Sequence, residues 1–532
     1  MSLASPNDAR NRFDALSTAL LQRVLTPIVA LWCAFLLVTW VPTYLTWTWW
    51  ADSEHFALLA QSWASGILPY RDMFSFQFPG EIYVFYALGK TFGWGNTVAY
   101  YAFDASLVIL FSVILVAWGR KLSGSLLPGL IGTSTFLLFY LSQNSHVAGQ
   151  REWHATFLVV TSLILPFLGT GAFFRLTSAF AFGLALVVRP QVVVILPAIL
   201  FAIDGSARAS EESWTRTLKA MTAWAVVASL TLTASFLPLI WAGVVGTLLD
   251  CLKEVSQSSY NQTGFRQLLL RILPHKLPLS LISVIPLILL FMQETQAPAR
   301  RAGWSILLAL AGVVFYSAIS PMLMAYHAIP QVAIASLGVT FFATQLLGQA
   351  RDPRLTLATL TLTFLFFGAS EAPLSLKALR PGDDTNSIPV SLKSLLKHEL
   401  PPAPPLGYDN TASYPWTDHR AALLYLREKT TLDTLVANLM IDNRAALTSQ
   451  VPRLTPLVTA DVGSLLMLNL PSLLDRNALA LQSAPPSTVV LWNPHSPEAS
   501  SPRYDHLFST VRRFYHPETQ LGNIAVWRKN PH

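Results

Sequence analysis

The sequence predicts a polytopic α-helical membrane protein that ends in a small α/β domain. Hydrophobic residues make up 52% of its 532 residues and charged residues 12%, against roughly 25% charged residues in ordinary globular chains. The mean hydropathy is +0.45. Apolar runs near the ~20 residues that cross a bilayer recur as far as Gly368, and the composition becomes more polar from Ser370 onward.

Composition also excludes several classes of protein. The formal net charge is +7, but the basic residues lie between apolar runs and form no patch of the kind that binds nucleic acid. The two cysteines, Cys33 and Cys251, fall in a span and in a loop, which predicts neither a disulfide framework nor a Cys-x-x-Cys metal site. The first apolar run, Val24–Trp50, is too long for a signal-peptide core and lacks a small-residue cleavage site, so we expect a permanent anchor.

The apolar runs predict about eleven spans within a transmembrane domain of residues 24–369. In order, they are Val24–Thr46, Thr97–Trp118, Leu126–Leu141, Trp153–Phe174, Thr177–Val188, Val192–Ile203, Ala220–Val245, Leu277–Met292, Trp304–Ile319, Ile329–Leu347 and Leu355–Gly368. The fifth and sixth are short and are separated by Arg189-Pro190, which indicates a broken pair. Polar loops are expected at Asp204–Lys219 and Asp250–Arg266.

The positive-inside bias orients these spans. If residues 1–23 are cytoplasmic, most basic residues between spans are cytoplasmic as well, namely Arg120, Lys121, Arg175, Arg208, Arg216, Lys219, Arg300, Arg301, Arg351 and Arg354. The same arrangement places the first loop, 51–96, outside, and an odd number of spans places residues 370–532 outside too. Arg266, Arg271 and Lys276 oppose the bias, because they would also lie outside.

The first outer loop is too polar to cross a bilayer. Apolar residues at helical spacing predict an amphipathic helix over Glu54–Trp63 and a second short helix over Ile82–Phe92. Two turns separate them, Pro-Tyr-Arg-Asp at Pro69–Asp72 and Phe-Pro-Gly at Phe78–Gly80. Helices of this kind lie in the membrane interface, so the loop indicates a reaction performed at the membrane surface.

This loop resembles the first extracytoplasmic loop of the GT-C glycosyltransferases. The resemblance rests on an acid pair after the first span, followed by Gly-Ile-Leu-Pro-Tyr-Arg-Asp, Phe-Pro-Gly-Glu-Ile-Tyr and Phe-Gly. The nearest group is that of the bacterial protein-mannosyltransferases and aminoarabinose transferases, which move a sugar from a polyprenyl-phosphate carrier to an acceptor outside the membrane. The resemblance implies an enzyme of the bacterial inner membrane with such a donor and with a glycan, lipid or protein acceptor.

Asp52 and Glu54 are the expected catalytic residues. Sugar transfer to a hydroxyl needs a carboxylate within reach of the acceptor proton, and by resemblance Asp52 is that base, with inversion at the anomeric carbon. Both acids also suit the start of a helix, where capping would lower the pKa of Asp52 and make it a weak base. Glu54 and His55 fit the binding of an acceptor or a divalent ion, but one Asp-x-Glu-His run does not define a metal site.

Two arginines are expected to bind the donor phosphate, because Arg binds phosphate bidentately. Arg151 lies with Glu152 and His154 at the start of the fourth span, where an interfacial Arg-Glu pair is the alternative interpretation. Arg189 interrupts an apolar segment, which marks a functional site by default; the alternative is a snorkelling residue at the end of a span. Glu152 and His154 are further substrate-binding candidates.

Four other residues are weaker substrate-binding candidates. Arg71 and Asp72 fit an ion pair that holds their turn equally well. Tyr260 lies in an outer loop that could cover the site, although a solvated loop explains it too. His327 opens the tenth span on the outer side, where a lone His is more often an interface residue.

From Ser370 the chain reads as a soluble domain. A Pro-rich stretch, 381–405, precedes a helix over Arg420–Lys429 with Thr417-Asp418 as its cap, and strands are expected at Leu435–Ile441, Thr488–Trp492 and Asn523–Trp527. We expect docking, acceptor binding or stability as its role. Two rival functions stay open: a transporter or flippase, favoured by the Arg189-Pro190 break, and a membrane scaffold that presents this domain.

Overall fold

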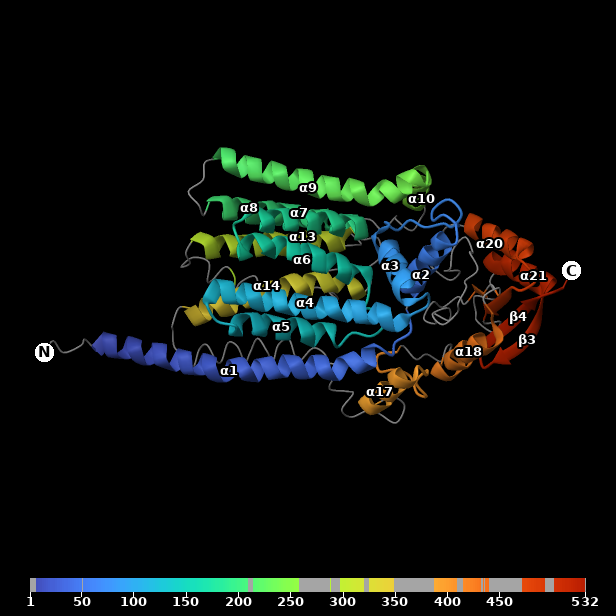
Figure 1. The fold of residues 1–532 in the computed structure, drawn as a ribbon, viewed down its shortest axis with the longest axis horizontal. Helices are drawn as coiled ribbons and strands as arrows, with labels where there is room; N and C mark the ends of the chain where they lie inside the picture. Colours follow the sequence, from blue (N-terminus) through green and yellow to red (C-terminus); the bar gives the residue numbers. More distant parts are fainter. Residues whose placement is uncertain are drawn as a thin grey trace.

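A computed structural model describes most of the chain. The described residues are 6–49, 51–208, 214–257, 288, 297–319, 325–348, 387–408, 415–431, 434, 436–439, 471–492 and 502–531. They form a bundle of long helices with shorter helices and a sheet at one end (Figure 1). We call the end that carries the first loop the loop end of the bundle.

The bundle helices run side by side along the long axis of the molecule (Figure 1). They are α1 (Pro6–Tyr44), α4 (Thr97–Ser123), α5 (Leu127–Tyr140), α6 (Arg151–Leu168), α7 (Ala172–Val188), α8 (Leu196–Arg208), α9 (Trp214–Trp241), α13 (Ala297–Ile319) and α14 (Ile329–Gly348). Within the described ranges, four segments are long and apolar enough to cross a bilayer, and they are Gln22–Tyr44, Thr97–Ser123, Thr215–Trp241 and Tyr326–Leu347. The chain is therefore a helical membrane protein.

Most expected spans coincide with these helices, but one expectation was wrong. The run Trp153–Phe174 is two helices, because α6 ends at Leu168 and α7 already begins at Ala172. Gly169 and Gly171 cap the two ends, and the apolar residues on both sides hid this turn in the sequence. Nearly all of Leu277–Met292 and the whole of Leu355–Gly368 lie outside the described residues, so the count of eleven spans stays a prediction.

Two short helices of the first loop cover the loop end of the bundle. They are α2 (Ala51–Ala64) and α3 (Gly80–Phe92), which confirms both predicted helices to within three residues. Trp63 joins them, with its ring centroid 5.8 Å from that of Tyr86. Gly80 starts α3 directly against α7, because a Cβ at this position would lie 2.7 Å from the backbone of Val188.

A third short helix, α10 (Val245–Gln257), follows α9 at the same end. The expected polar loop Asp250–Arg266 was therefore wrong over its first residues. Leu248, Cys251 and Val255 recur at helical spacing and are buried, which makes this stretch an amphipathic helix in place of a solvated loop. The Cys251 thiol donates to the carbonyl of Tyr70 at 3.7 Å and so joins α10 to the first loop.

The C-terminal region carries a sheet in which the strand order is β1-β2-β4-β3. Its elements are α17 (Ile388–Lys397), α18 (Trp416–Lys429), β1 (Val436–Asn438), α20 (Pro471–Ser483), β2 (Val489–Trp492), α21 (Asp505–Phe514), β3 (Tyr515–Leu521) and β4 (Ile524–Lys529). β1 is parallel to β2, while the β2–β4 and β4–β3 pairs are antiparallel. The three predicted strands are confirmed.

Two details of this region differ from expectation. β3 was missed, because this edge strand contains Pro517 and exposes most of its side chains, which removes the apolar alternation. The predicted cap of α18 was also wrong, since the helix begins at Trp416 after Pro415. Asp418 instead accepts a hydrogen bond from the Asn523 amide at 2.8 Å and ties the helix to the β3–β4 turn.

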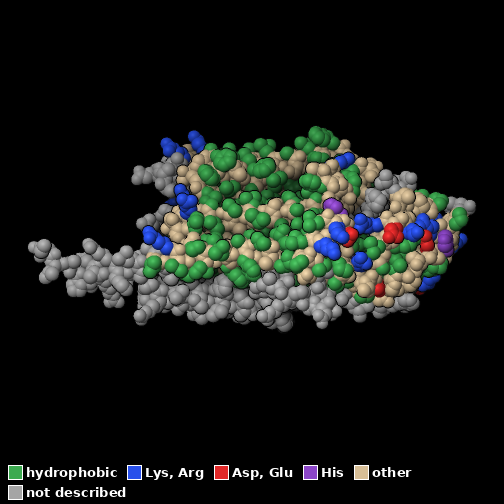
Figure 2. All heavy atoms as spheres, turned by 60° about the horizontal axis from the view of Figure 1, so that its bottom comes forward, with side chains coloured by type: hydrophobic (Ala, Val, Ile, Leu, Met, Phe, Trp, Pro, Cys, Tyr) green, Lys and Arg blue, Asp and Glu red, His purple; other side chains and the backbone are tan. Residues whose placement is uncertain are grey.

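The C-terminal region packs on the loop end of the bundle. The indole of Trp47, just after α1, donates to the Leu406 carbonyl at 2.7 Å. The amide of Ser145 donates to the Gly407 carbonyl at 3.1 Å. Figure 2 shows hydrophobic side chains over the bundle, Lys and Arg gathered at the end nearest the N-terminus, and both signs of charge at the opposite end.

Candidate active site

Asp52 and Glu54 lie in the first turn of α2, at the loop end of the bundle. Part of the Asp52 side chain stays accessible, yet protein surrounds its carboxyl group closely enough for burial to raise the pKa above its ordinary value of 3.8. The positive charges of Arg151 and Arg189 oppose this rise, and the negative charge of Glu152 adds to it. The expected lowering of the pKa by the helix start was therefore wrong, because desolvation outweighs it.

A buried cluster of charges lies beside Asp52. Arg151 and Glu152 begin α6, and Arg189 ends α7 in extended conformation just before the 3-10 helix η1 (Pro190–Ile195). The carboxylate of Glu152 lies 3.0 Å from Nη2 of Arg189 and 3.5 Å from Nε of Arg151. The two guanidinium groups and the one carboxylate carry a net charge of +1, which the carboxyl of Asp52 would balance when it is ionised.

Arg189 is held on several sides. Its Nε donates to the Tyr316 hydroxyl at 3.0 Å, and its Nη2 lies 3.1 Å from Nε2 of His327. His327 lies in the 3-10 helix η3 (Ala325–Ala328) and approaches Glu152 to 4.0 Å. The predicted residues Arg151, Glu152, Arg189 and His327 thus come together from α6, the α7–η1 junction and η3. We call these four residues the charged cluster.

Arg151 is less firmly held than Arg189. It donates to the side-chain oxygen of Gln77, and its guanidinium lies 5.4 Å above the ring of Phe56 on α2. These contacts fasten the turn between α2 and α3 to the start of α6. His55 is neutral near pH 7, because burial and the charge of Arg151 lower its pKa to about 4; its Nε2 lies 3.3 Å from the hydroxyl of Ser75.

Several predicted residues lie elsewhere. Glu54 is buried and accepts a hydrogen bond from Asn438 of β1 at 3.5 Å, so it faces the C-terminal region. Arg71 and Asp72 form an exposed pair at 2.8 Å, and Asp72 also accepts from the amide of Leu68, which supports the turn interpretation. Tyr260 lies outside the described residues.

His154 belongs to a second buried network, separate from the charged cluster. Its Nδ1 lies 3.0 Å from Glu81 of α3, and its Nε2 lies 3.0 Å from Asp104 of α4. The hydroxyls of Tyr44 and Tyr140 donate to Asp104 at 2.6 and 2.9 Å. The network fastens the start of α6, and with it the charged cluster, to its neighbouring helices.

The sequence interpretation missed Glu81, Asp104 and Gln77. A carboxylate inside a predicted span was available as a signal, because such residues are costly in a bilayer and usually functional; Asp104 met this criterion. Glu81 and Gln77 carried no such signal, since both lie in a polar loop. In the part of the chain that the structure describes, no group of three or more His, Cys, Asp or Glu residues is placed to hold a metal ion.

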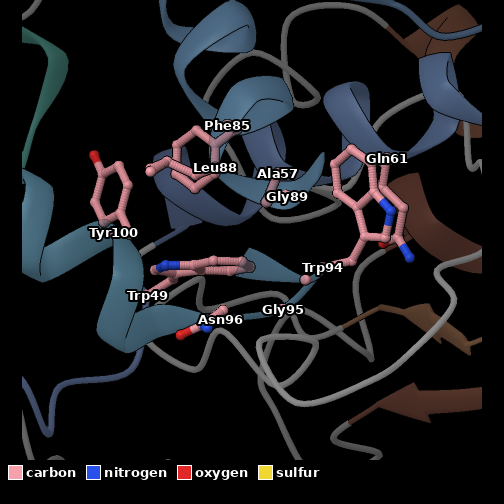
Figure 3. Close-up of a pocket in the computed structure, with 11 residues that line it drawn as sticks. Trp49, Ala57, Gln61, Phe85, Leu88, Gly89, Trp94, Gly95, Asn96 and Tyr100 are labelled. Carbon is pink, nitrogen blue, oxygen red and sulfur yellow. The ribbon is translucent and has the colours of Figure 1, made fainter. Parts of the chain in front are cut away.

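A small pocket opens behind α2. Its lining comes from α2, α3, the turn that follows α3 and the start of α4 (Figure 3). Gln61, in this lining, lies nine residues beyond Asp52, which places it on the opposite side of the helix. The rings of Trp49, Phe85 and Trp94 make the lining largely aromatic. The pocket is therefore distinct from the Asp52 side of the loop.

Comparison with known proteins identifies the class of fold. The helical bundle with its short loop helices and its end region has the same fold as a solved protein structure. That structure is ArnT from Cupriavidus metallidurans in the apo state, which matches with a TM-score of 0.56 and 15% sequence identity over 96% of this chain and 100% of that chain. Identity this low shows the fold alone. No family model and no curated protein matches the sequence.

Proposed function

We propose that this protein is a GT-C-type glycosyltransferase of a bacterial inner membrane. It moves a sugar from a polyprenyl-phosphate donor to a glycan, lipid or protein acceptor on the outer side. One observation carries the proposal: in a chain with the fold of ArnT, the carboxyl of Asp52 lies within the electrostatic field of Arg151, Glu152 and Arg189 at the loop end of the bundle.

Asp52 is the proposed base. A raised pKa makes the carboxylate a stronger base, which suits removal of a hydroxyl proton as the acceptor attacks. With one carboxylate at the acceptor and no covalent intermediate, the reaction inverts the anomeric carbon. Glu54 then has a supporting part, since its contact with Asn438 holds the start of α2 against the C-terminal region.

Arg151 is the better of the two candidates for the donor phosphate. Arg189 already has Glu152, Tyr316 and His327 as partners, so a phosphate would compete with three of its contacts. Arg151 has a neutral amide, that of Gln77, and a longer contact of 3.5 Å with the same Glu152 oxygen. We therefore assign Arg151 to the phosphate and Arg189 to the placement of Glu152.

A transporter or flippase is the second candidate. The interruption between α7 and α8 favours it, because discontinuous helices form the binding sites of many transporters. The transferase is the stronger candidate, since Glu152 already neutralises Arg189 at that interruption.

The two candidates differ in whether a bond is cleaved. Purified protein in lipid nanodiscs is incubated with a panel of polyprenyl-phosphate sugars and hydroxyl acceptors, and released polyprenyl phosphate is measured. The transferase predicts release that depends on Asp52. In proteoliposomes, movement of an intact labelled donor across the bilayer without any release would contradict the proposal and support a flippase.

A further inference from the structure

Helix α17 presents an unusual surface. It is the first described element of the C-terminal region, Ile388–Lys397, and it buries Ser391 and Ser394 on one side. On the other side, Leu392 is 44% exposed and Leu396 is 83% exposed, one helical turn apart. A lysine follows each leucine, at Lys393 and Lys397, and the helix contains no acidic residue. Exposed leucines interleaved with lysines are typical of helices that lie on anionic membranes.

The position of α17 fits this interpretation. The helix packs against α1 at the end of α1 nearest the loop end (Figure 1). The apolar segment of α1, Gln22–Tyr44, has 23 residues, a length of roughly 34 Å at ~1.5 Å per residue, which matches the hydrocarbon core. A helix at the end of this segment therefore lies at the depth of the lipid headgroups.

On the opposite side of the bundle, the end of α9 and the helix α10 lie at the same level as α17 (Figure 1). Trp241 ends α9 and is 80% exposed, as expected for a tryptophan in the interfacial belt. The amphipathic helix α10 follows it with Leu249 exposed. α10 and α17 lie at a similar position along the long axis of the molecule, on opposite sides of the bundle (Figure 1). The two helices thus mark the same level along the long axis, which is the level expected for the lipid headgroups.

We propose that α17 docks on the anionic phospholipids of the leaflet at the loop end of the bundle. Leu392 and Leu396 enter the boundary between headgroups and acyl chains, and Lys393 and Lys397 bind lipid phosphates. Charge decides the class of lipid, because two lysines without an acid on the helix favour anionic headgroups. The contact tethers the C-terminal region to the membrane independently of the transfer reaction.

Spin labels measure the depth directly. A nitroxide is attached at Leu396→Cys in the full-length protein that carries Cys33→Ala and Cys251→Ala, in nanodiscs with phosphatidylglycerol. Leu479→Cys on α20 is the matched control, because this leucine is also exposed (60%) on a helix of the C-terminal region. We expect the label at 396 to relax faster with oxygen than with a water-soluble nickel complex, and the label at 479 to show the reverse.

A second arm tests the charge. In phosphatidylcholine nanodiscs, or after Lys393→Gln with Lys397→Gln, the label at 396 should become severalfold more accessible to the nickel complex. Equal accessibility of the labels at 396 and 479 would overturn the docking. Equal depth in both lipids would overturn the anionic partner, and dipolar broadening between labels would assign the face to a second copy of the chain.

Discussion

At the residue scale, Asp52 combines two properties that a catalytic base needs. Its carboxyl is desolvated enough to raise the pKa, and Arg151 and Arg189 keep the charged form accessible. We predict that Asp52→Asn lowers transfer by at least about a thousandfold while the melting temperature changes little, because Asn is as good as Asp near a helix start. Initial rates and thermal denaturation of the same preparations test this. Transfer at the wild-type rate would remove Asp52 from the mechanism.

The raised pKa of Asp52 also predicts a pH profile. The ionised form is the base, so kcat/KM should fall as the pH drops through a midpoint above 3.8. Arg151 is the largest opposing influence on this pKa, so Arg151→Gln should move the midpoint to higher pH, whatever it does to the maximal rate. A profile measured with saturating donor tests both statements. If Arg151→Gln left the midpoint of the pH profile unchanged, the assigned influence of Arg151 on the pKa of Asp52 would be contradicted.

The sequence predicted Asp52 and all four residues of the charged cluster, and it missed their partners Gln77 and Tyr316. Asp52 stood out through the resemblance of the first loop to that of the GT-C glycosyltransferases. Arg151, Glu152 and Arg189 stood out because charges next to long apolar runs are costly and therefore informative. His154 stood out for the same reason, but it lies in the network with Glu81 and Asp104. A shift of one or two residues along a helix changes the side that a side chain faces, and the sequence did not settle this for α6. The sign of the pKa shift of Asp52 was not predictable, because it depends on how deeply the folded chain buries the carboxyl.

At the element scale, the two proposed arginine roles lie on different elements: Arg189 at the α7–η1 junction holds Glu152, and Arg151 at the start of α6 binds the donor phosphate. Removal of Arg189 leaves Glu152 buried with a weaker partner, so Arg189→Ala should destabilise the protein by roughly 3–5 kcal/mol. Arg151→Ala should instead raise the donor KM about tenfold to a hundredfold, equivalent to roughly 1.5–3 kcal/mol, and Arg151→Lys should recover part of the loss.

Donor KM and melting temperature, measured together, separate these roles. Arg528→Ala is the control, because it removes an arginine paired with Glu518 in the C-terminal region, away from the cluster. Glu152→Ala should resemble Arg189→Ala. If Arg151→Ala lowers the melting temperature and leaves the donor KM unchanged, Arg151 is structural and the phosphate role is wrong.

Close helix packing gives a second prediction at this scale. A Cβ at Gly132 of α5 would lie 2.7 Å from the Ser336 carbonyl of α14 and still closer to Thr340. Small residues let membrane helices approach in this way, so Gly132→Ala should cost roughly 1–3 kcal/mol of stability. Gly246→Ala on α10 is the control, since nothing lies within 4 Å of its Cβ and Ala is the better helix former. An unchanged melting temperature for Gly132→Ala would contradict the packing.

Elements were predicted better than the breaks between them. The apolar runs located the bundle helices because a bilayer selects for length and apolarity. The turn at Gly169 and the edge strand β3 were missed, since the first lies within continuous apolar sequence and the second has no apolar alternation. Helix α10 was missed because its apolar residues occupy only one face.

At the scale of the whole molecule, three contacts join the C-terminal region to the first loop and its surroundings. Trp47 meets Leu406, Ser145 meets Gly407, and Asn438 meets Glu54. None of these pairs was predictable, because the partners are separated by more than 250 residues and only the folded chain brings them together. The assembly places the sheet on the same end of the bundle as Asp52 (Figure 1).

This placement makes the topology testable. If the loop end faces outward, a cysteine at Ser65, which is exposed after α2, and one at Ser509, which is exposed on α21, should both react with an impermeant thiol reagent in intact cells. A cysteine at Lys121, exposed in the last turn of α4, should react only after lysis, because the basic end of the bundle faces the cytoplasm. The background carries Cys33→Ala and Cys251→Ala, since both native thiols are buried. If the cysteines at positions 65 and 509 were labelled on opposite sides of the membrane, the packing of the C-terminal region on the loop end would be contradicted. If only the cysteine at position 121 were labelled in intact cells, the orientation would be the reverse of the predicted one, and the Asp52 site would lie in the cytoplasm.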